Sequence, residues 1–277
     1  MTRILCVGLA TVDLVYEVPS IPGTDEKAQA SNLTIAAGGP AANAAVTAAA
    51  LGAEVTLVTV VGSHPLGVLV REELRDRGIE LIDADPGNPN PPPVSSVIVG
   101  ESTGERTVVS RNAGDRAARV PENALPDADL TLVDGHHPAL AVAAARAARR
   151  LLADAGSWRP VFPEVFPHAE VVACSAAFRH PGAGAADAAL AVAIGAPHVA
   201  VTHGPDPVTW FSGGESGQVT VPKVAAVDTA GAGDAFHGAL AVALARGEDF
   251  PVALASAVAV AGVRVVHRGP RAWLDAL

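Results

Sequence analysis

The chain has 277 residues, of which 49% are apolar and 4% aromatic, so its core must consist mainly of Ala, Val and Leu. That length is enough for one large α/β domain or two modest ones, and such a core suits closely packed helices and parallel strands better than an aromatic-rich β-sandwich. The 19 basic and 29 acidic side chains give a net charge of −10, which argues against a polyanion such as DNA as partner but leaves a small phosphorylated ligand open.

The N-terminal part of the chain predicts two kinds of β-structure. Residues 3–9 form a short apolar run that ends in small residues, as a buried parallel strand does. Over residues 12–37 apolar and polar residues alternate around a Pro- and Gly-bearing connection, which predicts an exposed antiparallel hairpin. A helix over 39–53, a core strand over 54–62 and a helix from Pro65 to Gly78 follow.

The middle of the chain repeats this alternation. Residues 83–94 contain five prolines and predict a loop, and a second exposed hairpin follows over 94–100 and 105–110, joined by the sequence ESTG. The remaining predicted elements are a strand over 130–135, an Ala/Arg helix over 139–154, strands over 170–174 and 198–204, a hairpin around 210–219 and two final helices. The pattern predicts a single α/β domain over 1–277 with a doubly wound, mainly parallel sheet, and a small lid sheet formed by about 12–37 and 94–111.

The composition also predicts where the protein works. Cys6 and Cys174 lie in apolar surroundings without C-x-x-C spacing, so both are expected to be reduced, buried thiols. The first residues lack the long apolar region of a signal peptide. The most apolar later stretch, 252–263, is about twelve residues where a membrane span needs roughly twenty. We therefore expect a cytoplasmic protein that does not enter a membrane.

A glycine-rich turn precedes the helix predicted over 231–246. In the sequence DTAGAGDAFHGAL (228–240), Gly231, Gly233 and Asp234 fall at the start of this helix, where peptide N–H groups lack intrahelical partners and the helix dipole is positive. The glycines let an anion approach the backbone closely. A carboxylate beside bound phosphate makes chemical sense if Asp234 accepts the proton of a hydroxyl that attacks a phosphoryl group.

Simpler explanations exist for the two acids of this turn. Asp234 could merely cap the helix, as Asp often does. Asp228 could be an ordinary loop acid or could help to hold a cation. A glycine-rich turn by itself does not decide between these alternatives.

A second cluster lies near the N-terminus. Gly38 and Gly39 come just before a predicted helix, and Asn43 lies one turn into it, where its amide can donate to and accept from adjacent sugar hydroxyls. Asp13 follows the first strand, at the edge where open α/β sheets bind ligands. A tight turn with a surface Asn is the alternative explanation for this cluster.

These two clusters together resemble the signatures of the ribokinase, or PfkB-type, family of carbohydrate kinases. The sequence GGPAANAA (38–45) is similar to the family's early G-G-x-x-x-N-x-A element, and residues 228–236 are similar to its late D-T-x-G-A-G-D-x-F element. Within the family, the stretches GPAANAAV, GERTVVS and AGDAFHGALAVALA look most similar to the ketohexokinase-like and sulfofructose kinase-like branch.

The resemblance implies ATP- and Mg²⁺-dependent phosphorylation of a sugar hydroxyl, on a ketose or related sugar. It makes Asp234 the base and the turn of Gly231, Ala232, Gly233 and Asp234 the anion hole. It assigns the sugar to Asp13, Gly38, Gly39 and Asn43, the nucleotide to Thr202, Gly204, Ala257 and Gly262, and a possible K⁺ to Asp228, Ala230 and Gly269.

The sequence departs from the family at one place. Members commonly carry an N-x-x-E element near the metal-phosphate site, and Ser175 and Phe178 stand where its Asn and Glu would be. Mg²⁺ would then be held mainly by phosphates and water, or the activity would be reduced.

Other polar residues and other functions remain open. Arg111 follows the second hairpin and is expected to reach the substrate, although its position fits a solvated Arg as well. His237 is expected to be a packing residue of the helix. A joint metal site of His136 and His137 is not expected. A nucleoside kinase, or a sugar- or nucleotide-binding regulator with little catalysis, is the alternative function. The predicted partners are a small sugar and ATP, with a homodimer through exposed lid edges as a further expectation.

Overall fold

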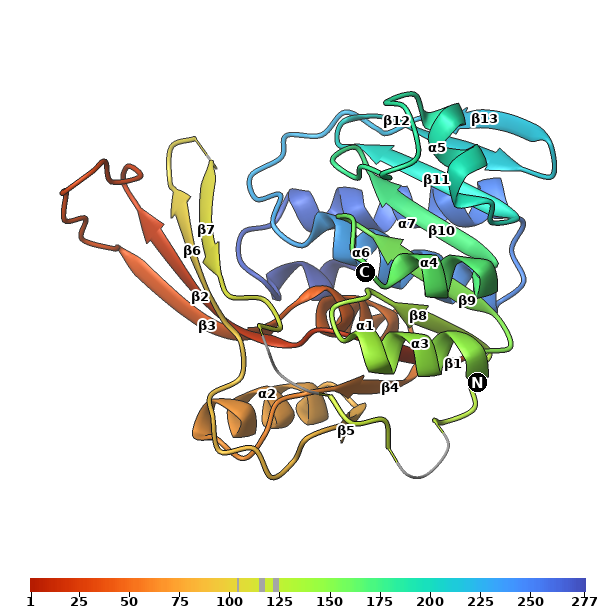
Figure 1. The fold of residues 1–277 in the computed structure, drawn as a ribbon. Helices are drawn as coiled ribbons and strands as arrows, with labels where there is room; N and C mark the ends of the chain where they lie inside the picture. Colours follow the sequence, from red (N-terminus) through yellow and green to blue (C-terminus); the bar gives the residue numbers. More distant parts are fainter. Residues whose placement is uncertain (104, 115–117, 122–124) are drawn as a thin grey trace.

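The computed structural model describes residues 1–103, 105–114, 118–121 and 125–277, which fold into two β-sheets flanked by helices (Figure 1). The larger sheet has nine strands in the order β13-β12-β11-β10-β9-β8-β1-β4-β5, and the smaller has four in the order β3-β2-β6-β7. Gly104, in the connection predicted between the second pair of lid strands, lies outside the described residues.

The strands of the larger sheet are β1 (Arg3–Val7), β4 (Glu54–Thr59), β5 (Ile79–Asp83), β8 (Leu130–Val133), β9 (Leu151–Ala155), β10 (Val171–Ser175), β11 (His198–His203), β12 (Asp206–Ser212) and β13 (Glu215–Val219). Those of the smaller sheet are β2 (Thr11–Val18), β3 (Asn32–Gly38), β6 (Val94–Gly100) and β7 (Arg106–Ser110). The helices are α1 (Pro40–Ala50), α2 (Pro65–Asp76), α3 (Pro138–Ala147), α4 (Phe162–Val165), α5 (Asp187–Ile194), α6 (Ala232–Ala245) and α7 (Phe250–Val265), with 3₁₀ turns η1 (Phe166–His168) and η2 (Ala272–Ala276).

The larger sheet is parallel from β11 to β5, whereas β12 runs antiparallel to both of its neighbours, β11 and β13. From β1 the chain adds β4 and β5 on one side, then crosses to β8 and adds strands on the other. The order therefore reverses between β1 and β8, and ligands of open α/β sheets bind at the carboxyl ends of the strands beside such a point.

Two apolar layers sandwich the larger sheet. Ile4 and Cys6 of β1 face a core that includes α1, α2, α6 and α7, whereas Leu5 and Val7 face the core of α3, α4 and α5. This alternation follows from the two-residue period of a strand, and both faces are apolar as expected for a covered parallel sheet. Figure 1 shows α6 and α7 behind the sheet and α3 and α4 in front of it.

The smaller sheet extends away from this body (Figure 1). Its two antiparallel pairs, β2–β3 and β6–β7, join through parallel pairing of β2 with β6. The two segments expected to form hairpins therefore make one continuous sheet, and β3 leads directly into α1.

One predicted helix is partly wrong. The helix expected over 139–154 ends at Ala147, and residues 151–155 form β9 in the middle of the sheet. All five residues of β9 are buried, and a short apolar run cannot be assigned to helix or strand from periodicity alone. Arg150 lies in the connection between α3 and β9 and pairs with Glu170 at 2.7 Å. The sequence analysis also did not predict β5, α4 and α5.

Both cysteines are free and buried, as predicted. Burial raises the pKa of the Cys6 thiol to about 12, and it raises that of Cys174 as well, so neither is a reactive thiolate near neutral pH. Among the described residues no helix is long and apolar enough to cross a bilayer.

Candidate active site

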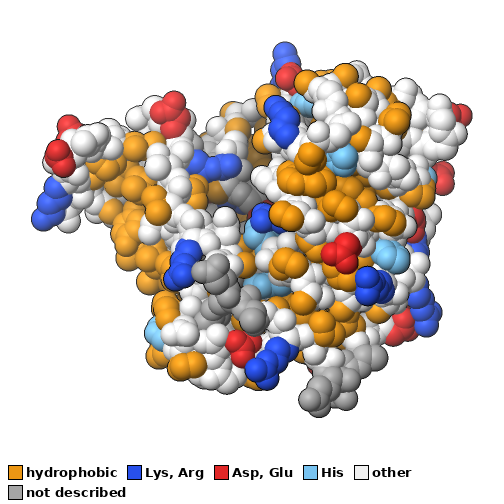
Figure 2. All heavy atoms as spheres, viewed as in Figure 1, with side chains coloured by type: hydrophobic (Ala, Val, Ile, Leu, Met, Phe, Trp, Pro, Cys, Tyr) orange, Lys and Arg blue, Asp and Glu red, His pale blue; other side chains and the backbone are white. Residues whose placement is uncertain are grey.

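Most of the predicted sugar and cation residues meet at one cavity between the two sheets. Its lining includes Asp13, Asn43, Asp228, Ala230, Gly231 and Gly269, together with Arg264 and Arg271. Val15, Val97 and Val99 of the smaller sheet line its other side. Figure 2 shows a hollow between the smaller sheet and the body.

The cavity is anchored at the carboxyl end of the larger sheet by Asp134, which follows β8. Its Oδ2 accepts hydrogen bonds from the N–H of Leu9 at 2.8 Å and from that of Ala41, in the first turn of α1, at 3.2 Å. Burial acts to raise the pKa of Asp134, but nearby His136 and the backbone donors outweigh it and hold the pKa below its usual range. A buried carboxylate thus fixes α1 against the end of β1.

Asp234 lies in the first turn of α6 and faces α1. The side-chain amide of Asn43 donates from Nδ2 to Oδ2 of Asp234 at 2.8 Å, although 191 residues separate the two. The N-cap of α6 is Gly231, and no side chain makes a capping hydrogen bond there. The carboxylate is therefore directed toward a predicted sugar residue, and helix capping does not explain its orientation.

Arg271, which the sequence analysis missed, fixes the orientation of Asn43. Its Nη1 donates to Oδ1 of Asn43 at 3.1 Å, and its Nε donates to Oε1 of Glu73 at 2.8 Å. Because a guanidinium can only donate, it requires the amide oxygen of Asn43 to face it, which turns the NH₂ toward Asp234. Arg271 also donates to the carbonyl oxygen of Ala37, in β3.

Asp13, on β2, lines the cavity together with Asp228. Thr11 donates from Oγ1 to Oδ1 of Asp13 at 2.6 Å. Burial raises the pKa of the Asp13 carboxyl above its usual range, and the negative charge of Asp234 adds to the rise. Further hydrogen bonds from ligand hydroxyl groups would stabilise the ionised form of this buried carboxyl.

The two glycines before α1 are required by the protein itself. A Cβ on Gly38 would lie 2.0 Å from Oδ2 of Asp13, and one on Gly39 would lie 2.5 Å from the carbonyl oxygen of Leu9. Gly39 also has φ +94°, which disfavours a side chain. These glycines let β3 pass close to Asp13 and turn into α1.

The turn before α6 presents backbone donors to the same region. Gly231 adopts φ +69°, and helix formation from Ala232 onward leaves the first peptide N–H groups without intrahelical acceptors. A Cβ on Gly233 would meet no atom within 4 Å, so open space lies beside this turn. The geometry suits an anion at the helix N-terminus.

Asp228 begins this turn and pairs with Arg264. Nη2 of Arg264 donates to Oδ2 of Asp228 at 2.9 Å, and the N–H of Gly269 donates to the same oxygen at 3.1 Å. The other oxygen, Oδ1, accepts the N–H of Ala230 at 2.9 Å. Arg264 was not identified from the sequence, because an Arg near the end of a helix is usually exposed.

The predicted nucleotide residues occupy different surroundings. Thr202 is half-buried at the end of β11, and Gly204 is exposed in the following turn with φ +64°. Gly262 is half-buried in α7, whereas Ala257 is fully buried in the core and forms no surface in this structure.

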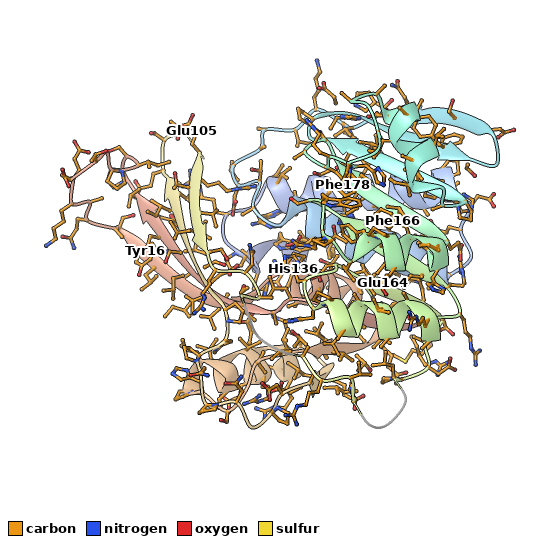
Figure 3. All side chains as sticks on the ribbon, viewed as in Figure 1. Tyr16, Glu105, His136, Glu164, Phe166 and Phe178 are labelled. Carbon is orange, nitrogen blue, oxygen red and sulfur yellow. The ribbon has the colours of Figure 1, made fainter. Side chains whose placement is uncertain are left out.

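The element that departs from the family holds no metal ligand. Oγ of Ser175 donates to the carbonyl oxygen of Gly156 at 2.8 Å, and the Phe178 ring packs 5.9 Å from Trp158 between ring centroids. Figure 3 shows Phe178 close to Phe166 within the body, with His136 nearer the smaller sheet. Within the described stretches, no cluster of three His, Cys, Asp or Glu side chains could hold a metal ion.

The remaining polar candidates lie around the cavity without lining it. His237 is buried, with Nε2 3.2 Å from the carbonyl oxygen of Ala173. His136 lies beside Asp134, with Nδ1 3.2 Å from Oδ1, and also contacts Arg159. Arg111 is exposed beyond β7, with its side chain over Gly114.

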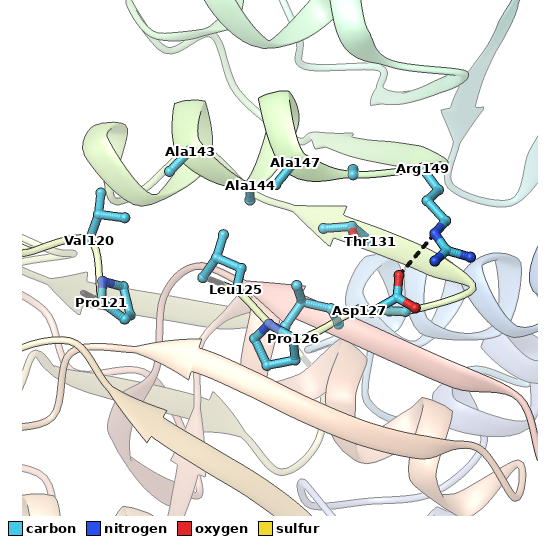
Figure 4. A pocket seen from close by; sticks show the side chains of 13 residues that line it. Val120, Pro121, Leu125, Pro126, Asp127, Thr131, Ala143, Ala144, Ala147 and Arg149 are labelled. Carbon is cyan, nitrogen blue, oxygen red and sulfur yellow. Dashed lines mark ion pairs between the residues drawn. The ribbon is translucent and has the colours of Figure 1, made fainter. Parts of the chain in front are cut away.

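A second hollow, between α3 and the described residues 120–121 and 125–128, contains none of the predicted site residues (Figure 4). Its walls are mainly Ala, Pro and Leu side chains, with an ion pair of 3.0 Å between Arg149 and Asp127 at one end.

Comparison with known proteins identifies the family and the fold of this chain. The family model described as pfkB family carbohydrate kinase matches residues 1–276. The ribokinase of Bacillus subtilis is 27% identical over 97% of this chain and 94% of its own length, and that of Arabidopsis thaliana is 27% identical over 96% of this chain and 76% of its own.

Solved structures show the same fold. A ribokinase from Thermotoga maritima superposes with a TM-score of 0.80 at 23% identity, covering all of this chain and 98% of its own. The Arabidopsis thaliana ribokinase complexed with ribose and ATP also gives 0.80, at 24% identity, with 99% and 97% covered. The predicted fold, a mainly parallel sheet flanked by helices with a smaller second sheet, is confirmed.

Proposed function

This chain belongs to the pfkB family of carbohydrate kinases, and we propose that it transfers the γ-phosphoryl group of ATP to a sugar hydroxyl with Asp234 as the general base. It is a sugar kinase of the ribokinase-like fold. The observation that carries the assignment of Asp234 is its hydrogen bond with Asn43, which directs the carboxylate into the space between α1 and α6.

The proton transfer follows from this placement. A sugar hydroxyl that replaces the amide of Asn43 on Oδ2 of Asp234 would give its proton to that oxygen while its own oxygen attacks the γ-phosphorus of ATP. The bond from this phosphorus to the bridging oxygen would break, and ADP would leave. General base assistance of this kind contributes roughly 10²–10⁴-fold. Asp234 is suited to the role because it lies next to the turn that would bind the phosphoryl group.

The helix N-terminus supplies the opposing charge. Peptide N–H groups of Ala232, Gly233 and Asp234, with Gly231 before them, would donate to the oxygens of the transferred group. They are held in place by α6, whose residues from Ala235 to Leu244 are buried, so little reorganisation is needed during the reaction.

The sugar would lie between Asp13 and Asn43, close to the Gly38–Gly39 turn. The carboxylate of Asp13 can accept from two hydroxyls, and such hydrogen bonds would offset the burial that raises its pKa. Val15, Val97 and Val99 would cover the sugar from the smaller sheet, which acts as a lid. Arg111 would approach only with movement of that sheet.

The nucleotide would bind along Thr202, Gly204 and Gly262, beside the start of α6. Ser175 and Phe178 do not fit a metal, because one donates to the backbone and the other lies in an aromatic cluster. Oxygens for Mg²⁺ would therefore come mainly from the phosphates of ATP and from water.

The substrate class is a small free sugar. Ketoses are favoured by the sequence resemblance, and ribose by the relatives named ribokinase. The protein would act in the cytoplasm, where two buried, unpaired thiols stay reduced. Two copies would pair through the smaller sheet, whose strand β3 exposes Leu33 and Ile35 to solvent.

The test is ADP release coupled to an indicator enzyme, with ribose, fructose and other ketoses, sulfosugars and nucleosides as acceptors. We expect turnover with one or more free sugars and none with nucleosides. Turnover with nucleosides alone would favour a nucleoside kinase. Ligand binding without any turnover would favour a regulator and would overturn the proposal.

A further inference from the structure

Arg264 is an arginine buried behind the predicted anion hole. It lies in the last turn of α7, and its side chain is 4% exposed. A Cβ placed on Gly231 would lie 3.9 Å from its Nε, so the guanidinium adjoins the glycine that begins α6. An arginine is seldom so deeply buried unless its charge is matched.

Three protein oxygens accept hydrogen bonds from this guanidinium. Nη2 donates to Oδ2 of Asp228 at 2.9 Å, and Nη1 donates to the carbonyl oxygens of His267 at 2.9 Å and Asp228 at 3.4 Å. A carboxylate and backbone carbonyls are also the oxygens with which a protein would coordinate a hard monovalent cation. Here they are already engaged by a positive group.

The neighbours expected to ligate a cation direct donors to the same carboxylate. The N–H groups of Ala230 and Gly269 donate to the two oxygens of Asp228, at 2.9 and 3.1 Å. With Nη2 of Arg264 on Oδ2 as well, that oxygen has two donors and no free direction toward a metal. A K⁺ ion at Asp228, Ala230 and Gly269 does not fit this arrangement.

We propose that the guanidinium of Arg264 is a permanent replacement for a monovalent cation, so that phosphoryl transfer by this kinase does not depend on K⁺. The group carries the same single positive charge as K⁺. It acts through Asp228 and the turn to Gly231, and is therefore a positioning residue for the anion hole. The inference rests on the proposed function for its kinetic part.

A buried ion pair that only stabilises the fold would look similar in the structure, but it predicts a different response to cations. If Arg264 replaces the cation, its removal leaves a site with one negative charge and several oxygens that K⁺ can fill. If it is only a packing residue, its removal leaves no preference for K⁺ over other cations.

The first measurement uses the unaltered enzyme. Rates are compared in about 0.1 M chloride of K⁺, Na⁺ or tetramethylammonium, so that ionic strength is constant. We expect kcat and both KM values to agree within about twofold, which is less than 0.5 kcal/mol at RT of about 0.6 kcal/mol. A saturable increase of more than about threefold with K⁺ alone would overturn the proposal.

The second measurement uses Arg264→Ala, with the exposed Arg146→Ala as the matched control. In tetramethylammonium we expect kcat of R264A to fall about 10- to 100-fold, as when a residue that supports a functional group is removed, and K⁺ to restore much of it. R146A should behave as the parent does. An R264A enzyme that is fully active without K⁺, or folded but not restored by it, would overturn the proposal.

Melting temperatures give a readout that needs no sugar. R264A should gain a K⁺-specific rise in melting temperature that the parent and R146A lack, and folded R264A without that rise would count against the proposal. If no acceptor is ever phosphorylated, this measurement still tests the cation site, so the two proposals fail separately. If R264A does not fold, the rates of the unaltered enzyme in the three chloride salts decide whether the proposal holds.

Discussion

The two sides of the candidate active site are built differently. On the proposed sugar side, charged and polar groups form a continuous network from Glu73 through Arg271 and Asn43 to Asp234. At the proposed metal-phosphate element, on the nucleotide side, Phe178 packs against other rings and Ser175 bonds to the backbone. The proposed sugar side therefore carries a network of polar side chains, whereas Ser175 and Phe178 are engaged within the protein. Substitutions on the two sides should separate catalysis from stability.

The largest effect is expected for Asp234→Ala. Loss of the proton acceptor should lower kcat by about 10²–10⁴-fold. The helix should remain, because Asp234 makes no capping hydrogen bond. ADP release measures the rate and circular dichroism checks the fold. Asp249→Ala is the matched control, since Asp249 also lies at a helix start without a capping bond. A parental rate for D234A would reduce Asp234 to a structural acid.

The next effect should appear in stability and not in sugar binding. Phe178 is 2% exposed and contacts three aromatic rings, so Phe178→Ala should lower the free energy of unfolding by about 3–5 kcal/mol. Sugar KM should stay near the parental value wherever the variant is folded. Urea unfolding measures the first quantity and initial rates the second. Val192→Ala, at a residue 84% exposed, is the control. A large rise in sugar KM would show that the two sides are coupled.

Removal of Arg271 should affect the sugar side alone. Arg271→Met frees the amide of Asn43 to rotate, and we expect sugar KM to rise about 10- to 100-fold with a much smaller change in ATP KM. Arg77→Met is a close control, because Arg77 approaches the same oxygen of Glu73 at 3.9 Å. Equal effects of both substitutions would mean that the charge near Glu73 matters and the contact with Asn43 does not.

The sequence could predict some residues of the candidate site and not others. Gly38, Gly39, Asn43 and Asp234 lie in short motifs next to helix starts, where backbone geometry restricts the residue type. The hydrogen-bond partners of the two arginines lie far away in the sequence. Arg264 is 36 positions from Asp228, and Arg271 is 228 positions from Asn43. No local pattern encodes such a partner.

The fold shows the same division. The strand-helix alternation and the two segments of the smaller sheet were predictable, because both depend on hydrophobic periodicity. Strand β9 was not, since its five residues continue an Ala-rich stretch and only burial between β8 and β10 makes them a strand. Ala257 was assigned to a pocket from the resemblance, and packing between α6 and α7 buries it instead.

The smallest effect concerns the free energy of unfolding that is lost because the ionised carboxyl of Asp13 is buried. Burial raises its pKa in the folded protein, so the ionised form destabilises the folded state, and stability falls as the pH rises through that raised pKa. Asp13→Asn removes the charge and keeps an acceptor for Thr11. Without sugar, we expect the variant to melt roughly 2–4 °C higher at neutral pH, the shift that about 1 kcal/mol produces in a chain of this size.

This gain should disappear at a pH below the ordinary pKa of an aspartate, because Asp13 is then protonated in both the folded and the unfolded chain. Melting temperatures across the acid range measure the difference, with the exposed Asp206→Asn as control. An unchanged or lower melting temperature of D13N at neutral pH would mean that Thr11 and the other donors already compensate for the buried charge. The carboxylate of Asp13 would then need no hydroxyl donors from a sugar. The proposed sugar side would lose a buried carboxylate that a ligand stabilises, which is the feature that most distinguishes it from the nucleotide side.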